Sequence, residues 1–209
     1  MSSFDPQDRQ DNLAAGVTMK LYRVSQAVKL LLREKSQAHG LSATQLQALL
    51  FLAYARPQVH TIGGLAERLG CTAATASGVV NALERKGLAN RETQPEGGRR
   101  VMVTLTDEGM VMATRVEDSL EEIELLVNQL PAQDQAALLQ LVGLVERGLV
   151  ERGRIKAYGM CWDCRFFRPD AHSNDPLGPH HCSIYGIPVN EINSRKECPD
   201  FGSKEETVA

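Results

Sequence analysis

The sequence predicts a mainly α-helical protein with a small β-hairpin wing, a winged helix-turn-helix, followed by a small irregular cysteine-rich segment at the C-terminal end. Three observations support this class. Up to about residue 154, apolar residues recur every three or four positions, the spacing of amphipathic helices. Residues 89–105 instead contain two short strand-like runs around a Pro-Glu-Gly-Gly turn. After Ala157 neither period is sustained, and aromatic, proline and cysteine residues become frequent.

Local start and stop signals divide the helical part of the chain. Ser42 and Thr106 are suited to cap helix N-termini, and Gly40, Gly70 and Gly87 are suited to end helices. Proline at the start of the final helix is compatible with its first turn. Helices are therefore expected at residues 12–35, 42–55, 61–69, 72–86, 107–130 and 131–154. Strands are expected at 89–93 and 101–105.

Length and composition limit the function classes. The 209 residues can form one domain and a small appendage, with a net charge of −3. No apolar run reaches the roughly 18–20 residues that a membrane span requires, and the polar N-terminus does not read as a secretory signal. We therefore expect a cytoplasmic protein without a membrane partner. No phosphate-binding glycine loop, paired-carboxylate site or nucleophile motif stands out, so an enzyme is not expected.

The expected domains follow from these patterns. They are a disordered lead at 1–11, a helical domain at 12–156 with a DNA-binding unit at about 42–106, a cysteine-rich extension at 157–202 and a flexible tail at 203–209.

Two helices separated by Gly70 and followed by an arginine-bearing hairpin form the winged pattern. In such a unit one helix enters the major groove, and the hairpin reaches the phosphate backbone or minor groove. Because the net charge is negative, DNA binding must depend on local basic residues. The alternative is a protein-interaction module whose arginines are simply solvated. The candidate DNA-contacting residues are Thr72, Thr75, Ser77, Asn81, Arg85, Lys86, Arg91, Arg99 and Arg100.

Two stretches, "TIGGLAERLGCTAATASGVVNALERKGL" and "GGRRVMVTLTDEG", resemble the MarR family of bacterial transcriptional regulators. The resemblance covers roughly residues 12–152. It implies a homodimer with intertwined long dimerisation helices, a pseudo-palindromic operator in double-stranded DNA and a repressor role, and it allows a small-molecule effector. The family pattern has an acidic residue two positions before the wing-tip arginine, here Gly97 before Arg99, and many relatives have arginine at the position of Gly78. Base readout is therefore assigned to Ser77 and Asn81.

The C-terminal extension holds four of the five cysteines: Cys161, Cys164, Cys182 and Cys198. Two thiolates at Cys-x2-Cys spacing can bind one metal centre from a single turn, and two distant ones can complete the coordination. The extension is therefore expected to bind one metal centre through all four cysteines, which senses redox state, oxygen or metal. The alternatives are a thioredoxin-like pair, a regulatory disulfide and buried structural thiols.

The choice of metal depends on the surrounding residues. Aromatic and apolar residues near the cysteines would exclude water from a cluster, and the pattern is weakly similar to that of high-potential iron–sulfur proteins. A [4Fe–4S] cluster is slightly favoured over Zn²⁺. His180 or His181 could replace a thiolate, although ordinary loop histidines are the simpler interpretation, and Cys71 is more readily a semi-buried residue than a redox switch. Two alternatives remain for the whole protein: an electron-transfer protein that docks through its winged unit, or a regulator with a structural zinc clip.

Overall fold

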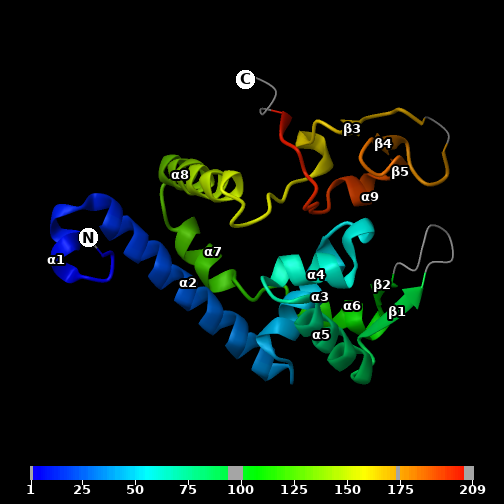
Figure 1. The fold of residues 1–209 in the computed structure, drawn as a ribbon, viewed down its shortest axis with the longest axis horizontal. Coiled ribbons are helices and arrows are strands. Elements are labelled where there is room, and N and C mark those ends of the chain that lie inside the picture. Colours follow the sequence, from blue (N-terminus) through cyan, green and yellow to red (C-terminus); the bar gives the residue numbers. More distant parts are fainter. Residues whose placement is uncertain (1, 94–100, 173–174, 205–209) are drawn as a thin grey trace.

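The structure, a computed structural model, describes residues 2–93, 101–172 and 175–204. Figure 1 shows the winged unit at the lower right, the long helices to its left and a small C-terminal extension above it. The helices and strands are α1 (Pro6–Asp11), α2 (Leu13–Ala38), α3 (Ala43–Tyr54), η1 (Pro57–Val59), α4 (Ile62–Leu69), α5 (Ala73–Arg85), β1 (Ala89–Thr93), β2 (Val101–Leu105), α6 (Asp107–Val116), α7 (Glu121–Asn128), α8 (Ala132–Glu151), η2 (Cys161–Asp163), β3 (Phe167–Arg168), β4 (His180–Cys182), β5 (Ile187–Val189) and α9 (Glu191–Ser194). The mainly helical fold with a β-hairpin wing is confirmed.

Side-chain caps fix the helices of the winged unit. Ser42 accepts a hydrogen bond from the backbone of Gln45, whose side chain accepts one from the Ser42 backbone, so α3 begins with a complete capping box. Thr61, Thr72 and Thr106 cap α4, α5 and α6 in the same way, each accepting from a backbone N–H three residues on. These polar residues determine where each helix begins.

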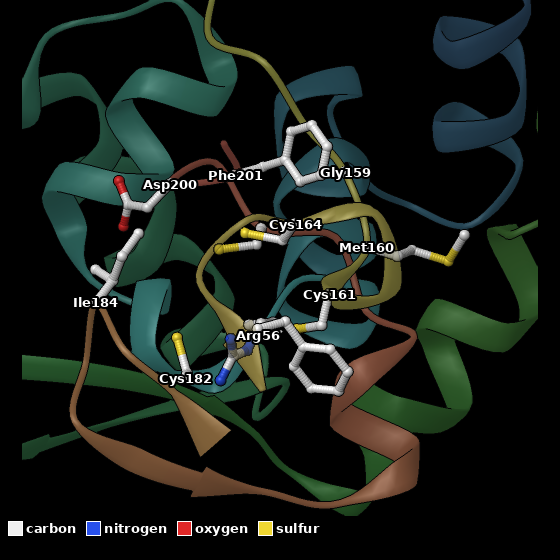
Figure 2. Close-up of a pocket in the computed structure, with 11 residues that line it drawn as sticks. Arg56, Gly159, Met160, Cys161, Cys164, Cys182, Ile184, Asp200 and Phe201 are labelled. Atoms are coloured by element: carbon white, nitrogen blue, oxygen red, sulfur yellow. Dashed lines mark hydrogen bonds between the residues drawn. The ribbon is translucent and has the colours of Figure 1, made fainter. Parts of the chain in front are cut away.

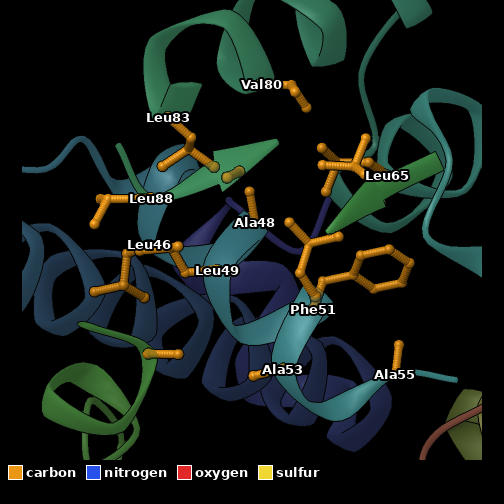
Figure 3. Close-up of a cluster of buried hydrophobic side chains, with 14 of the residues drawn as sticks. Leu46, Ala48, Leu49, Phe51, Ala53, Ala55, Leu65, Val80, Leu83 and Leu88 are labelled. Atoms are coloured by element: carbon orange, nitrogen blue, oxygen red, sulfur yellow. The ribbon is translucent and has the colours of Figure 1, made fainter. Parts of the chain in front are cut away.

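The core of the winged unit surrounds α3. Figure 3 shows Leu46 and Leu49 of this helix among side chains from α4 and α5, including Leu65, Val80 and Leu83. All five side chains are fully buried. Burial of a large aliphatic side chain contributes about 1.5–3 kcal/mol, so this cluster holds the two helices of the helix-turn-helix against α3.

The wing is an antiparallel hairpin attached to the loop before α4. Arg91 in β1 pairs with Val103 in β2. The N–H of Val103 also donates to the carbonyl of His60 at 2.7 Å, and Thr61 forms a bridge with Met102. His60 and Thr61, just before α4, therefore pair with β2 in the manner of a short third strand. The expected Pro-Glu-Gly-Gly turn, residues 95–98, lies outside the described residues.

Two helical expectations need correction. Residues 6–11 form α1 rather than a disordered lead, because Asp5 caps the helix and Phe4 packs edge-on against Tyr22. The helix expected at 107–130 is divided into α6 and α7. At the break the Ser119 hydroxyl donates to the carbonyl of Val116, and such side-chain bonds compete with the regular helical pattern.

The C-terminal extension is more regular than the sequence indicated. Strands β3, β4 and β5 form a three-stranded antiparallel sheet, and the short helix α9 follows. Trp162 in η2 donates to the Ser194 hydroxyl of α9 at 3.0 Å, which joins the two ends of the extension. The strands are two or three residues long, too short to produce a recognisable alternation in the sequence.

The long helices leave a large apolar surface exposed. Helix α8 has no buried residue, although it carries large hydrophobic side chains on more than one side, and α7 exposes Leu125 and Leu126. Leu139 is 78% exposed and Leu13 of α2 is 85% exposed. None of the helices in the described part of the chain has both the length and the apolar character needed to cross a membrane. A helix that is apolar on several sides is normally covered by another protein surface.

His60 makes the fold sensitive to acid. Burial disfavours its charged form and lowers its pKa to about 4, although its hydrogen bond to the Ala55 carbonyl acts in the opposite direction. In the unfolded chain its pKa returns to about 6.5. Above pH 6.5 the ring is neutral in both the folded and the unfolded state, and its contribution to the free energy of unfolding is fully present. Between pH 6.5 and 4 only the unfolded chain takes up the proton, so stability falls.

We therefore expect His60 to cost about 2 kcal/mol of unfolding free energy per protomer between pH 7 and pH 5. Urea unfolding at the two pH values measures this loss. The matched variant is His60→Gln, whose amide can donate to the same carbonyl without titrating. Its stability should change less over that interval, and an identical pH dependence in the two proteins would contradict the assignment.

Candidate DNA interface and cysteine cluster

Helix α5 presents one buried and one exposed face. Ala76, Val80 and Leu83 are buried in the core. On the opposite side, Thr72, Thr75 and Asn81 are exposed and Ser77 is partly exposed. Thr72 caps the helix through the Thr75 N–H, and the two hydroxyls lie 2.9 Å apart. The exposed face therefore offers short polar side chains of the kind that can approach base edges closely.

Arg91 joins the wing to this helix. Its guanidinium pairs with the Glu84 carboxylate. It also donates to the Asn81 side-chain oxygen at 2.6 Å and to the Ser77 carbonyl and hydroxyl oxygens at 3.1 and 3.2 Å. The two residues assigned to base readout are thus held together by one arginine from β1. This arrangement fixes the orientation of the Asn81 amide before any ligand is present.

The other basic candidates differ in their surroundings. Arg85 is exposed at the end of α5. Lys86 is also exposed, but its ammonium donates to the carbonyl of Gly40 at 2.8 Å and so secures the loop before α3. Arg99 and Arg100 lie outside the described residues. Arg85 is therefore the candidate best placed for a phosphate among those described.

Backbone pairing brings the four cysteines of the extension together. Cys182 in β4 pairs with Phe167, just after Cys164. Cys198 forms a bridge with Gly159, just before Cys161. The turn at η2 is closed by a hydrogen bond of 2.9 Å from the Cys164 N–H to the Cys161 carbonyl. Residues far apart in sequence therefore lie side by side, and all four thiols are buried.

The four sulfurs line one enclosed cavity of about 10 Å³ (Figure 2). The same cavity receives Arg56 from the segment between α3 and η1, and Arg56 is only 2% exposed. Its Nη1 donates to the Cys161 sulfur at 3.4 Å, and its guanidinium also interacts with the Cys182 sulfur. Figure 2 shows this guanidinium between Cys161 and Cys182. The site combines four thiols and one cation.

Two opposing effects act on these thiols. Burial raises the pKa of Cys198 to about 11 and also raises that of Cys161. The Arg56 guanidinium acts in the opposite direction on both pKa values. The pKa of Arg56 itself is raised, because the adjacent sulfurs outweigh the effect of its burial. Burial thus favours thiols, whereas the cation favours thiolates.

The donor set fits a thiolate-ligated metal centre in composition. In the described part of the chain, no three His, Cys, Asp or Glu side chains are already arranged as ligands of one ion. Metal binding would therefore require the four thiols to move closer together. A single Zn²⁺ requires less movement than a four-iron cluster in so small a space.

The histidines do not line this cavity. His180 is buried between Trp162 and Phe167, accepts a hydrogen bond from the Asp170 N–H and faces the Glu191 carboxylate at 3.0 Å. Its two ring nitrogens are both engaged, so it serves the packing of the extension. His181 instead contacts His172 at 2.8 Å. Cys71, partly buried, packs against the core of the winged unit, apart from the other cysteines.

The comparisons with known proteins agree with the winged geometry. A family model described as "MarR family" matches residues 39–100, which span the helix-turn-helix and part of the wing. Residues 39–100 thus match the winged-helix domain of the MarR family. A search of curated proteins gave no match. The cysteine-rich extension lies beyond the residues matched by the family model.

Solved structures of MarR-type proteins share this fold. A DNA complex of S. aureus MepR is 22% identical, with a TM-score of 0.56, covering 63% of this chain and 97% of that one. A MarR-family transcriptional regulator from Silicibacter pomeroyi is 22% identical, with a TM-score of 0.55 and coverage of 68% and 94%. NadR in complex with 4-hydroxyphenylacetate is 20% identical, with a TM-score of 0.50 and coverage of 62% and 91%. The chain thus has the fold of MarR-family transcriptional regulators.

The extension docks on the MarR-type domain at the end of α3. The N–H of Glu197 donates to the Tyr54 carbonyl at 3.1 Å, and the Lys196 ammonium donates to the Ala53 carbonyl at 3.0 Å. These are terminal carbonyls of a helix, which otherwise lack partners. Arg68 of α4 pairs with Glu197 at 3.2 Å. The extension therefore completes the C-terminus of α3.

Sequence reasoning missed Arg56 and Glu84. Glu84 lies three and seven positions after Asn81 and Ser77, so helical spacing alone could have placed it on the same face as both. Arg56 had no comparable signal, because its partners are more than 100 residues away in the chain.

Proposed function

We propose that the protein is a cytoplasmic, sequence-specific DNA-binding repressor that acts as a homodimer. The observation that carries this proposal is the joined surface of α5 and β1, where Arg91 holds Ser77 and Asn81 in one exposed polar face. Asparagine can bind adenine through two hydrogen bonds, and the serine hydroxyl can bind several bases. The MepR relative was solved in complex with DNA, which supports the same use of this fold here.

The exposed apolar helices support the homodimer. In the described structure, α8 and parts of α2 and α7 leave many large hydrophobic side chains uncovered. A second copy of the same chain would bury these faces and present two α5 helices to a pseudo-palindromic operator about one helical turn apart.

Substitution of Asn81 tests the base-reading role. Asn81→Ala should lose about 1–3 kcal/mol of discrimination at one base position in each half-site, because the bidentate contact is removed. Arg85→Ala should instead weaken binding to all sequences and reduce the salt dependence by about one phosphate in each half-site. Operator selection from random duplexes, followed by titration at several salt concentrations, separates the two effects. Unchanged selectivity of the Asn81 variant would contradict the assignment.

We propose that the extension holds a metal centre ligated by Cys161, Cys164, Cys182 and Cys198, which senses redox state, oxygen or metal. The convergence of four buried thiols on one cavity supports this proposal. Four thiolates are suited to Zn²⁺ and to a [4Fe–4S] cluster alike.

Anaerobic purification tests the centre. We expect one centre per chain, and Cys182→Ser should lose it because three thiolates cannot complete the coordination. Cys71→Ser is the matched control and should retain it. Iron, zinc and acid-labile sulfide analyses with a visible spectrum distinguish the two metals. Metal-free protein under both iron and zinc reconstitution would exclude the centre.

A small-molecule effector is a separate proposal. NadR was solved with 4-hydroxyphenylacetate. In this chain an open pocket of about 290 Å³ lies at the start of α6, lined by Leu88, Asp107, Glu108, Val111, Met112 and Arg115.

A further inference from the structure

The presence of four thiols does not explain why Arg56 is buried beside them in the same cavity. It is fully buried, and its Nε has no hydrogen-bond partner. Among the described residues no carboxylate lies within ion-pair distance of its guanidinium, whose side-chain contacts are the sulfurs and the Tyr185 ring, 5.7 Å from Cζ. A guanidinium does not lose its proton in proteins. A permanent cation is therefore buried among sulfur atoms.

The charge of this cation must be offset by its surroundings. Removal of a charge from water is unfavourable unless an opposite charge accompanies it. Neutral thiols provide weak acceptors but no negative charge, whereas four thiolates on Zn²⁺ or on a [4Fe–4S] cluster form an anionic centre. Arg56 is therefore matched to the metal-bound form of the site, and N–H groups directed at ligand sulfurs are a common way of tuning such centres.

The position of Arg56 in the chain gives it a second role. Its backbone N–H donates to the Glu197 carbonyl at 2.9 Å, one residue before Cys198. On its other side, the carbonyl of Arg56 accepts from the Val59 N–H, and the next residue, His60, accepts from Val103 of the wing strand β2. Only three residues thus lie between Arg56, whose cation occupies the cysteine cavity, and His60, whose backbone anchors the wing.

We infer that Arg56 is a positioning residue that neutralises the anionic metal–thiolate centre and transmits its state, within one protomer, to the wing and the start of α4. This inference rests on the proposed metal centre. Formation of the centre holds the guanidinium in the cavity and fixes η1 against the extension. Loss of the centre leaves the cation uncompensated and releases this segment. The route passes through the DNA-binding unit itself and does not require a change in the dimerisation helices.

The test compares full-length wild type with Arg56→Gln, Arg56→Lys and the matched control Arg195→Gln, which removes an exposed arginine from the same extension. Each protein is reconstituted anaerobically with iron and sulfide or with Zn²⁺. Two quantities are measured: the rate of metal release to a chelator, and the ratio of operator affinities in the loaded and metal-free forms. Fluorescence of Trp162, the sole tryptophan, reports whether the extension remains docked.

We expect loaded wild type and Arg195→Gln to differ from their metal-free forms about 5–150-fold in operator affinity. Arg56→Gln should release metal to the chelator about 10–100-fold faster, because its metal affinity is lower. The ratio of its operator affinities in the loaded and metal-free forms should approach one. Arg56→Lys retains the charge without the planar donor set, so it should retain metal better than Arg56→Gln. If Arg56→Gln does not fold, the test depends on Arg56→Lys and on the ratio of operator affinities of loaded and metal-free wild type.

The outcomes separate the two proposals. Wild type that takes up neither metal overturns the centre and this inference together. Wild type that loads normally, alongside Arg56 variants with unchanged metal release and unchanged affinity ratios, overturns the inference alone. If loaded and metal-free wild type bind the operator equally well, the centre is only a structural clip. That result also overturns the inference that Arg56 transmits its state.

Discussion

The Gly109→Ala variant is expected to lose about 3 kcal/mol or more of unfolding free energy. Gly109 lies in the first turn of α6, directly over the start of β1. A Cβ at this position would be 1.9 Å from the Leu88 carbonyl oxygen and 2.9 Å from its carbon. Because the obstacle is backbone, no rotamer change relieves it. The same carbonyl accepts from the Thr106 N–H at 3.2 Å, so α6 cannot shift without disturbing its own cap and the wing.

Gly78→Ala provides the matched control. Gly78 is exposed within α5, and a Cβ there would have no atom within 4 Å. Alanine in an exposed helical position stabilises by up to about 1 kcal/mol relative to glycine, so this variant should gain stability. Urea unfolding followed by circular dichroism, at equal protomer concentrations, measures both variants. A Gly109→Ala protein as stable as wild type would mean that α6 is not packed against Leu88 as described.

The winged unit could be predicted from sequence because the signals that define it act over short distances along the chain. Its helix caps, its stop glycines and the Thr106-x-x-Gly109 motif are local signals, each acting within a few residues. Ser42 and Thr106 were sufficient to place two helix starts because a side-chain cap depends on its own turn. The hairpin bounds followed from the two short strand-like runs on either side of the Pro-Glu-Gly-Gly turn.

The remaining features depend on contacts between distant parts of the chain. The apolar pattern of a helix continues across the break at Ser119, so periodicity alone predicted a single helix. The cysteine spacing predicted that the four thiols share a site, and the structure brings them to one cavity. The sequence could not indicate which surface would receive the extension. That surface is set by the carbonyls of Ala53 and Tyr54 and by Arg56, none of which has an unusual sequence pattern.

Disruption of the exposed face of α8 is expected to have the largest effect on DNA binding. Leu141 and Val145 lie one turn apart, and they are 62% and 48% exposed. Two carboxylates at these positions would be buried against the partner without counter-charges, which a dimer interface cannot accommodate. We expect the Leu141→Asp/Val145→Asp protein to be monomeric at micromolar concentration. Its operator affinity should fall about 100-fold or more, because the second half-site no longer binds with the first.

The control carries the same added charge at polar positions of the same helix. Gln133 and Gln140 are exposed, so Gln133→Asp/Gln140→Asp tests charge and helix propensity without replacing apolar side chains. Analytical ultracentrifugation gives the oligomeric state, and titration of full and half operators gives the affinities. If α8 forms the dimer, the control remains dimeric and the apolar double variant binds full and half operators equally. A dimeric Leu141→Asp/Val145→Asp protein would place the interface on other helices, with α2 and α7 as the remaining exposed apolar faces.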